Sequence, residues 1–209
     1  MAIAGIEYAI CGTEKYSSPM CQHRSRRGGA TSASAARDDN GPMIENVRHP
    51  VEDDHPRVVA VLVDWWDGIG GETGDRYRSR LLPRLFFQHF TDTSYVLDLP
   101  GGELGAFLVG FVSQSRPTVG YIHVVGVAPR LRRTGVGAAL YHRFCTDTAA
   151  RGVREVHAIT GLANRRSVAF HTGLGFTLRP GDTEVDGLPL HRDYDGPGLD
   201  AFTFVKHLP

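Results

Sequence analysis

Apolar side chains recur along the chain with two different periods, and the change of period separates predicted helices from predicted strands. The first half predicts a short strand, two helices and two strands, over residues 43–49, 51–66, 76–90, 94–99 and 103–114. Pro83 marks a kink or a late start in the second helix, because proline disrupts a helix interior. The expected apolar face of that helix comprises Leu81, Leu82, Leu85, Phe86 and Phe90.

The second half alternates strictly between the two periods. It predicts strand 120–127, helix 135–150, strand 154–160, helix 165–174 and strands 175–178 and 201–208. Strands first, followed by alternating strands and helices, indicate an α/β domain with a mixed sheet. The helix from Gly135 carries Val136, Leu140 and Phe144 on one face, so it is expected to pack on the sheet and leave its N-terminus free.

Residues 22–42 contain no Val, Ile, Leu, Met, Phe, Trp or Tyr. Such a segment has almost nothing to bury against the entropy of ordering, so we expect a disordered extension over residues 1–42. This stretch is either a flexible tail or sequence upstream of the functional start, and residues 43–209 form the expected folded domain.

Composition narrows the function classes. The 209 residues carry 23 basic and 23 acidic side chains, and a neutral chain lacks the basic surface typical of proteins that bind nucleic acid or anionic membranes. No apolar run is long enough for a membrane span, and residues 1–20 lack the pattern of a signal peptide. The three cysteines fit neither a paired disulfide framework nor a zinc site, so we expect a cytoplasmic protein without a metal.

A basic, glycine-rich turn between strand 120–127 and helix 135–150 is the strongest chemical signal. Arg132 and Arg133 precede a helix whose first turn holds Gly135 and Gly137. Unpaired N–H groups at a helix N-terminus carry about half a positive charge, and glycines allow a pyrophosphate close to the backbone. For this turn alone, a relaxed connection with solvated arginines is the alternative.

Two nucleotide motifs fail on their spacing. A Walker loop needs GxxxxGK followed by Ser or Thr, which is absent. A dinucleotide-binding fold needs a small residue where Leu140 stands and an acid where His157 stands.

A second motif follows this turn along the chain. The run Arg132-x-x-Gly135-x-Gly137, followed by residues 164–176, NRRSVAFHTGLGF, closely resembles the two hallmark motifs of the GNAT superfamily of N-acetyltransferases. The resemblance implies a mixed, mostly antiparallel sheet of six to seven strands with a splayed, bulged strand, flanked by about four helices. It also implies transfer of an acetyl group from acetyl-CoA to a primary amine, by direct attack in a ternary complex.

The resemblance assigns the cofactor site residue by residue. The first motif would hold the pyrophosphate of acetyl-CoA, and backbone groups of the bulged strand would bind its pantetheine arm. Asn164 would touch that arm, although Asn is also a good helix N-cap. The remaining residues that the resemblance implies for acetyl-CoA are Val125, Val127, Arg132, Arg133, Thr134, Gly135, Gly137 and Ala138. Val125 would also donate its N–H to the thioester carbonyl, a task of the oxyanion-hole kind.

Three side chains are candidates for proton transfer. Strand alternation puts Tyr121 and His123 on one face, and many members of the family carry a Glu base at the His123 position. The family commonly has a Tyr acid at the His171 position, so His171 would keep that role with different chemistry. The alternatives are a core histidine at 123, packing at Tyr121 and a helix-surface residue at 171. Cys145 lies mid-helix and is expected to be an inert thiol.

Two loops would wall the acceptor site in such a protein. Their aromatic rings and carboxylates suit a cationic amine, through cation–π and charge pairing, and they include Trp65, Trp66, Asp67, Glu72, Tyr194 and Asp195. The alternative is that Trp65 is core and the acids are turn residues. We expect a small-molecule amine as acceptor, against a non-catalytic acyl-CoA-binding module or an enzyme that acetylates protein amines. Homodimers are frequent for such domains, but no dimer surface can be read from the sequence.

Overall fold

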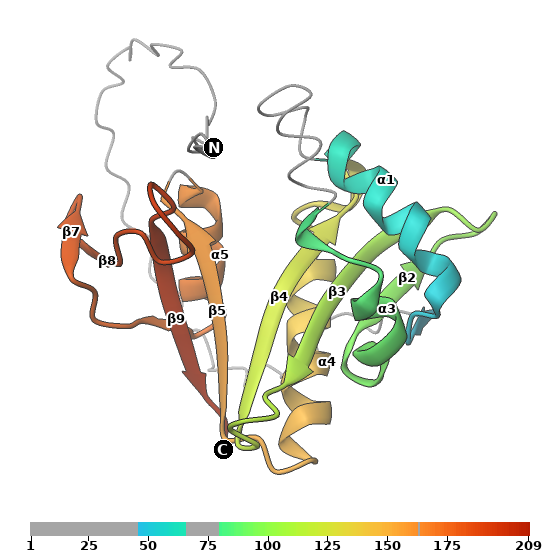
Figure 1. Cartoon of the computed structure of the whole chain (residues 1–209). Coiled ribbons are helices and arrows are strands. Elements are labelled where there is room, and N and C mark those ends of the chain that lie inside the picture. The colour runs from blue at the N-terminus through green and yellow to red at the C-terminus, as the bar shows by residue number, and fades with distance from the viewer. Residues whose placement is uncertain (1–45, 66–79, 163) are drawn as a thin grey trace, which may run out of the picture.

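Seven strands form one twisted sheet in the order β1-β2-β3-β4-β5-β9-β6 in the computed structural model, which describes residues 46–65, 80–162 and 164–209 (Figure 1). Only β4 and β5 pair in parallel, and the other neighbours are antiparallel. The strands are β1 Val47–Arg48, β2 Tyr95–Asp98, β3 Leu104–Val112, β4 Val119–Val127, β5 Glu155–Gly161, β6 Thr177–Leu178 and β9 Ala201–His207. The expected mixed, mostly antiparallel sheet is therefore confirmed.

Helices cover both faces of this sheet. They are α1 His55–Trp65, α3 Leu85–His89, α4 Val136–Ala149 and α5 Arg165–Gly173. Helices α1 and α3 pack on one face, which we call the front, and α4 and α5 pack on the back (Figure 1). Each face has its own hydrophobic core, the front one centred on Phe107 and the back one on Phe144. Within the described ranges, no helix combines the length and the apolar character that crossing a membrane requires.

Pro83 interrupts the second predicted helix. Arg80 and Leu81 are helical, Leu82–Arg84 are not, and α3 starts at Leu85 and spans only five residues. The break changes the phase of the helix, so Phe87 is buried and Leu85 is 44% exposed. The expectation that Leu85 faces the core is therefore wrong, although Leu82 is buried as expected.

A two-stranded hairpin, which the apolar pattern does not reveal, stands apart from the main sheet. Strands β7 Thr183–Val185 and β8 Leu188–Leu190 are joined by Asp186 and Gly187, both with positive φ. Two such residues suit the tight turn of a two-residue hairpin. Arg165 of α5 bonds to Asp186, which ties the hairpin to the back of the sheet.

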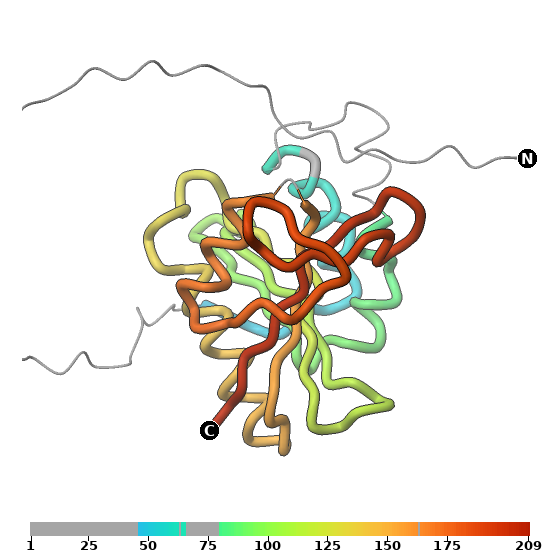
Figure 2. Tube along the Cα trace, turned by 90° about the vertical axis from the view of Figure 1, so that its left-hand side faces the viewer, coloured from blue at the N-terminus to red at the C-terminus, as the bar shows by residue number. Residues whose placement is uncertain are grey.

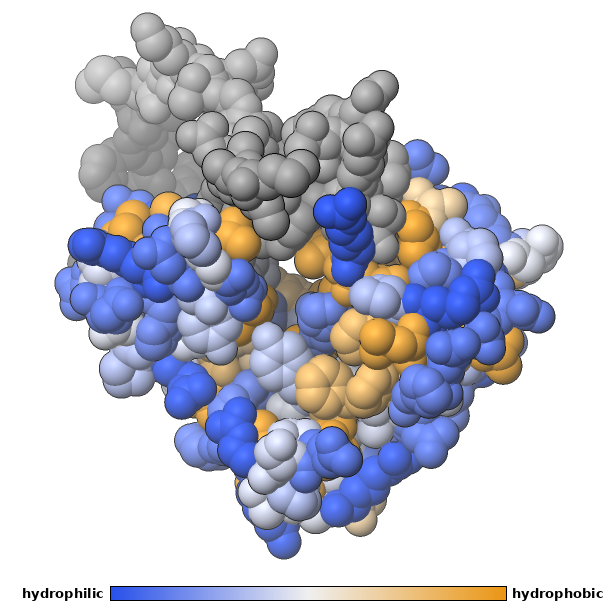
Figure 3. Space-filling model, viewed as in Figure 1, coloured by the Kyte–Doolittle hydropathy of each residue, from blue (hydrophilic) through white to orange (hydrophobic). Residues whose placement is uncertain are grey.

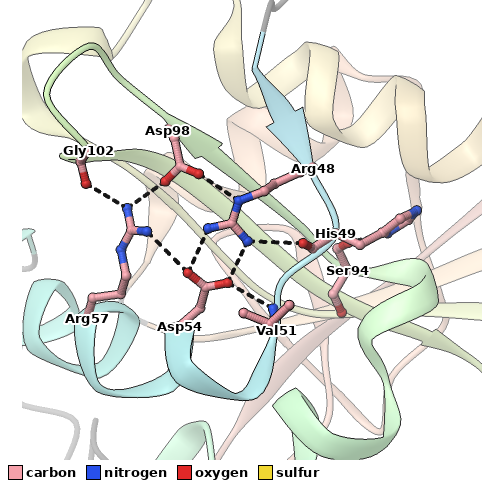
Figure 4. Close-up of polar contacts among 8 residues, drawn as sticks. All are labelled: Arg48, His49, Val51, Asp54, Arg57, Ser94, Asp98 and Gly102. Atoms are coloured by element: carbon pink, nitrogen blue, oxygen red, sulfur yellow. Dashed lines mark hydrogen bonds and ion pairs between the residues drawn. The ribbon is translucent and has the colours of Figure 1, made fainter.

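Four charged side chains join β1 to the start of α1 and to β2 (Figure 4). The Asp54 carboxylate accepts both Nη groups of Arg48, at 2.7 and 2.9 Å, and Nη1 of Arg57 at 3.2 Å. Asp98 accepts Nε of Arg48 at 2.7 Å and Nη2 of Arg57 at 2.6 Å. The Asp54 side chain is only 4% exposed, so this cluster closes one end of the front core. Two positive and two negative charges balance within it.

Candidate acetyl-transfer site

Strands β4 and β5 separate half-way along their length (Figure 1). Their parallel pairing covers only Val119–Ile122 of β4 against Glu155–Ala158 of β5. Both strands continue beyond it, β4 to Val127 and β5 to Gly161. The upper halves therefore enclose a V-shaped opening in the sheet.

A bulge at His123 lies where this opening starts. Val124 pairs with Val109 and Ile122 with Gly110, so His123 is an extra residue in β4. The bulge exchanges the two faces of the strand. Ile122 joins the back core, whereas Val124 joins the front core and Val125 packs against the back core. The predicted bulged strand is therefore present.

Backbone groups of β4 line one side of the opening. The N–H of Ala128 donates to the carbonyl of Gly105, on the β3 side. Because successive residues of a strand point their backbone groups to opposite sides, those of Val127 and Val125 point toward the opening. An unpaired strand edge of this kind can bind an extended amide chain.

The turn above the opening leads into the N-terminus of α4. Arg133 and the N-cap residue Gly135 have positive φ, at 65° and 90°, and no side chain caps the helix. The first N–H groups of a fourteen-residue helix are thus left for another acceptor. Gly137 lies where a Cβ would come within 3.3 Å of Phe170, which explains the small residue.

The two arginines of this turn behave differently. Arg132 donates to the carbonyl of Val127 at 3.3 Å and to the carbonyl of Trp65, so its guanidinium braces β4 and the end of α1. Arg133 is exposed. The hydroxyl of Thr134 donates to the carbonyl of Leu131 at 2.7 Å. All three residues expected at a phosphate are therefore exposed, and Arg132 and Thr134 also hydrogen-bond to backbone carbonyls of the protein itself.

His123 is held in one orientation on the front face. Its Nε2 lies 2.7 Å from the carbonyl oxygen of Leu81, and its ring stacks on Phe86 with centroids 4.7 Å apart. A carbonyl only accepts, so Nε2 carries the hydrogen and Nδ1 keeps a lone pair. Burial lowers the pKa of His123 below its usual value, against the opposing effects of the Leu81 hydrogen bond and the Asp195 charge. The imidazole is therefore a neutral base at pH 7.

Tyr121 shares this face with His123, as strand alternation predicts. Burial raises the pKa of Tyr121, and both Tyr194 and Asp195 raise it further. Asp195 thus acts electrostatically on Tyr121 and on His123. Tyr194 and Asp195 lie in the segment before β9. Figure 2 shows that this segment projects to the side on which α1 and α3 lie.

The loop around Asp195 is internally bonded. Asp193 accepts the N–H of Gly198 at 2.6 Å and donates its own N–H to Asp200 at 2.9 Å. The N–H of Asp195 donates to the carbonyl of Leu199. These bonds give the loop a defined shape beside β4.

A family model described as "Acetyltransferase (GNAT) family" matches residues 59–176, more than half of the chain. The chain belongs to this GNAT family. Two curated relatives match shorter stretches. A mycothiol acetyltransferase of Nocardioides sp. is 39% identical over 67 residues, 32% of this chain and 23% of that protein. A phosphinothricin N-acetyltransferase of Streptomyces viridochromogenes is 40% identical over 55 residues, 26% of this chain and 30% of that protein.

These alignments span less than a third of either relative. Among solved structures, the ribosomal-protein-S18-alanine N-acetyltransferase from Escherichia coli superposes with a TM-score of 0.55. It is 17% identical, and the match covers 77% of this chain and 92% of that one. At this identity the likeness shows the GNAT fold alone.

His171, at the position where the GNAT family commonly has a Tyr, lies in the back core. It is 4% exposed and stacks on Phe204 with centroids 4.6 Å apart. Its Nδ1 lies 2.8 Å from the carbonyl of Ser167, so Nδ1 carries the hydrogen and Nε2 accepts from the Tyr141 hydroxyl at 3.0 Å. Burial lowers the pKa of His171 and keeps the ring neutral. The helix-surface alternative is wrong, and in this arrangement neither ring nitrogen is available to a thiolate.

The remaining residues expected at the acceptor and the cofactor lie in different places. Trp65 is buried in the front core and stacks on Phe107 at 5.9 Å, so its ring packs and does not wall an acceptor site, which corrects that expectation. Trp66, Asp67 and Glu72 lie outside the described residues. Asn164 caps α5 by accepting the N–H of Ser167 at 3.1 Å. Its contact with the cofactor stays a prediction.

Two residues of this region were not anticipated from the sequence. Tyr141 partners His171 from α4, and Phe86 stacks on His123 from α3. Among the described residues, no three His, Cys, Asp or Glu side chains gather as a metal site would require.

Proposed function

We propose that this protein is an acetyl-CoA-dependent N-acetyltransferase that acetylates a primary amine of a small molecule, with residues 43–209 as the catalytic domain. The opening between β4 and β5 carries this proposal, because it combines an unpaired strand edge, an uncapped helix N-terminus and a neutral base at the bulge. Membership of the GNAT family supports the same chemistry.

The residues of the opening fit acetyl-CoA. The N–H groups at the start of α4, including that of Ala138, and the side chain of Arg133 supply positive potential for a pyrophosphate. The backbone groups of Val125 and Val127 are oriented for the amides of a pantetheine arm. Acetyl-CoA, when bound, supplies an activated acetyl thioester. The Val125 N–H then serves the carbonyl oxygen as charge develops on it.

We assign the role of general base to His123. Its Nδ1 lone pair accepts the proton of the attacking amine, directly or through water, while its Nε2–H stays bonded to Leu81. The Asp195 charge, which acts on His123 and Tyr121, stabilises the imidazolium that forms and attracts the cationic acceptor.

Direct transfer needs no covalent enzyme intermediate. Burial raises the pKa of the half-buried Cys145 thiol, which makes it a poor nucleophile. We assign the proton that returns to the thiolate to water, because His171 and Tyr141 are both buried in the back core and hydrogen-bonded to each other.

Thiol release with a panel of amines tests the proposal. The full-length protein and its His123→Gln variant are assayed with acetyl-CoA and, separately, polyamines, amino acids, arylalkylamines and lysine-containing peptides. Acetyl-CoA-dependent release with a small amine, lost in His123→Gln, supports it. Release of the CoA thiol with the peptides alone would show that the acceptor is a protein amine and not a small molecule.

One observation favours a second candidate, a GNAT-fold module that binds acyl-CoA without turnover. The family's usual phenol is absent at position 171, and the histidine that replaces it is occupied by Tyr141 and Ser167. Such a module would bind acetyl-CoA in a calorimeter and release no thiol with any amine.

A further inference from the structure

Five aromatic rings form a continuous row on the front face, beginning and ending on β4 at His123 and Tyr121. From His123 the row crosses to Phe86 at 4.7 Å and then to Phe90 at 5.3 Å between ring centroids. It continues from Phe90 to Phe111 at 5.3 Å and returns from Phe111 to Tyr121 at 5.4 Å. The rings come from α3, the residue that follows it, β3 and β4.

Four of these rings line a surface and do not fill a core, and the fifth, Phe86, packs against the front core. Phe90, Phe111, Tyr121 and His123 are only partly buried and belong to neither hydrophobic core. The neighbouring Phe87 provides the contrast, since it is 2% exposed and packs in the front core. In Figure 3, which looks onto this face, apolar side chains gather on the side of α3 and β3, next to a recess in the middle of the face.

Charge along the row is concentrated at one place. Of the described residues, Asp195 is the carboxylate whose charge acts on both Tyr121 and His123. No arginine or lysine of the described ranges contributes to the pKa of either residue. Within the described residues, the row therefore offers a base, several aromatic faces and the negative charge of Asp195, and no cation there acts on Tyr121 or His123 to pair with a carboxylate on the acceptor.

We propose that the acceptor is an arylalkylamine, a primary monoamine on a short alkyl chain that ends in an aromatic group, and that Phe90 and Phe111 determine this preference. The inference rests on the proposed acetyltransferase function. Asp195 and the ring faces attract the ammonium group, and Phe90 and Phe111 bury the aromatic end.

The reaction balances without a further reactant. The amine nitrogen bonds to the acetyl carbon as the carbon–sulfur bond breaks, and the amine proton passes to His123. The products are the N-acetyl amine and free CoA after the thiolate regains one proton. A polyamine would leave its second ammonium on this apolar row, and an amino acid would leave its carboxylate beside Asp195.

The test compares 2-phenylethylamine, 2-cyclohexylethylamine and putrescine as acceptors, with CoA release measured at saturating acetyl-CoA. Phe90→Ala and Phe111→Ala should each lower kcat/KM for phenylethylamine about tenfold, the loss expected for removing one ring's apolar contact. Their kcat/KM for putrescine and their KM for acetyl-CoA should stay within about twofold. Phe111→Leu should spare cyclohexylethylamine more than phenylethylamine, because it keeps the apolar area and loses the ring face.

A matched control lies on the same helix. Leu85 is 44% exposed and outside the row, so Leu85→Ala should leave all three substrates unchanged. Preference for putrescine in the unaltered protein, or equal losses for all substrates in folded Phe90→Ala and Phe111→Ala, would overturn the arylalkylamine assignment while leaving acetyl transfer in place. Absence of CoA release with every amine would instead refute the proposed function and this inference with it.

Discussion

Replacing Asp54 with alanine should destabilise the fold by about 3 kcal/mol, the lower end of the cost of breaking a buried ion pair. The carboxylate accepts three arginine hydrogen bonds and also the N–H of Val51 at 2.8 Å, all of which the variant loses. Arg48 and Arg57 are 41% and 31% exposed, so they regain water and the cost stays near that lower end. For a chain of this size the melting temperature should fall by about 6–12 °C.

Urea unfolding followed by circular dichroism measures this difference, with Asp53→Ala as the matched control. Asp53 is the exposed neighbour of Asp54, and its replacement should change the free energy of unfolding by less than about 0.5 kcal/mol. A loss below about 1 kcal/mol for Asp54→Ala would refute the view that this cluster (Figure 4) fixes β1 and α1 to the sheet.

The same variant has a defined pH dependence. Burial raises the pKa of Asp54, but the hydrogen bonds from Arg48 and Val51 and the two arginine charges outweigh it, so the net pKa is lowered. A lowered folded-state pKa contributes stability above the unfolded-state value, and that stability is lost as the pH falls through the folded-state pKa. The stability gap between the unaltered protein and Asp54→Ala should therefore be constant near pH 7 and shrink below about pH 4. A gap that widens in acid would contradict the assignment.

Three further predictions concern the site and its supports. His123→Gln should lower kcat by about 10²- to 10⁴-fold. In the unaltered protein kcat/KM should fall as the pH drops through the lowered pKa of His123, below about 6.5, and the variant should lose this fall. A pH–rate series checks both. Gly110→Ala should destabilise the bulge by about 1–3 kcal/mol in thermal unfolding, because its Cβ would come 2.5 Å from Phe144. Asn164→Ala should cost about 1 kcal/mol in the same assay through loss of the α5 cap, and Asn164→Asp should restore it.

Local patterns in the sequence predict most of the elements and one face of most helices. Val58, Leu62 and Trp65 recur at helical spacing and are all buried, so the periodicity of α1 already indicates that Trp65 is core. Val168 and His171 likewise share one face of α5, and both are buried. In both helices the hydrophobic period predicts the burial of the side chain correctly, whereas the residue type alone suggested a side chain at the acceptor site for Trp65 and at the thiolate for His171.

The hairpin of β7 and β8 could not be predicted from the hydrophobic pattern because its strands are short. Each strand has three residues, and Pro189 interrupts the second, so no alternation is long enough to stand out. The Asp186-Gly187 pair is nevertheless a strong turn signal, and it could have been found from the sequence.

Contacts between distant segments could not be predicted from local patterns. The hydrogen bond between Tyr141 and His171 joins two helices through residues thirty positions apart, and the Asp195 charge acts on His123 because the segment before β9 projects to the front of the sheet (Figure 2). The exact position of the bulge depends on the register of β3 against β4, in which Val109 and Gly110 skip His123. These features arise from tertiary packing, which fixes the catalytic geometry after the elements have formed.

The cofactor site and the reaction can be tested together by titrating the protein with acetyl-CoA in a calorimeter, then adding an amine to the same sample and identifying the products by mass spectrometry. We expect saturable binding of one acetyl-CoA per chain and, with an arylalkylamine, equal amounts of N-acetylated amine and free CoA. Failure to bind acetyl-CoA would contradict the assignment of the opening between β4 and β5 as the cofactor site.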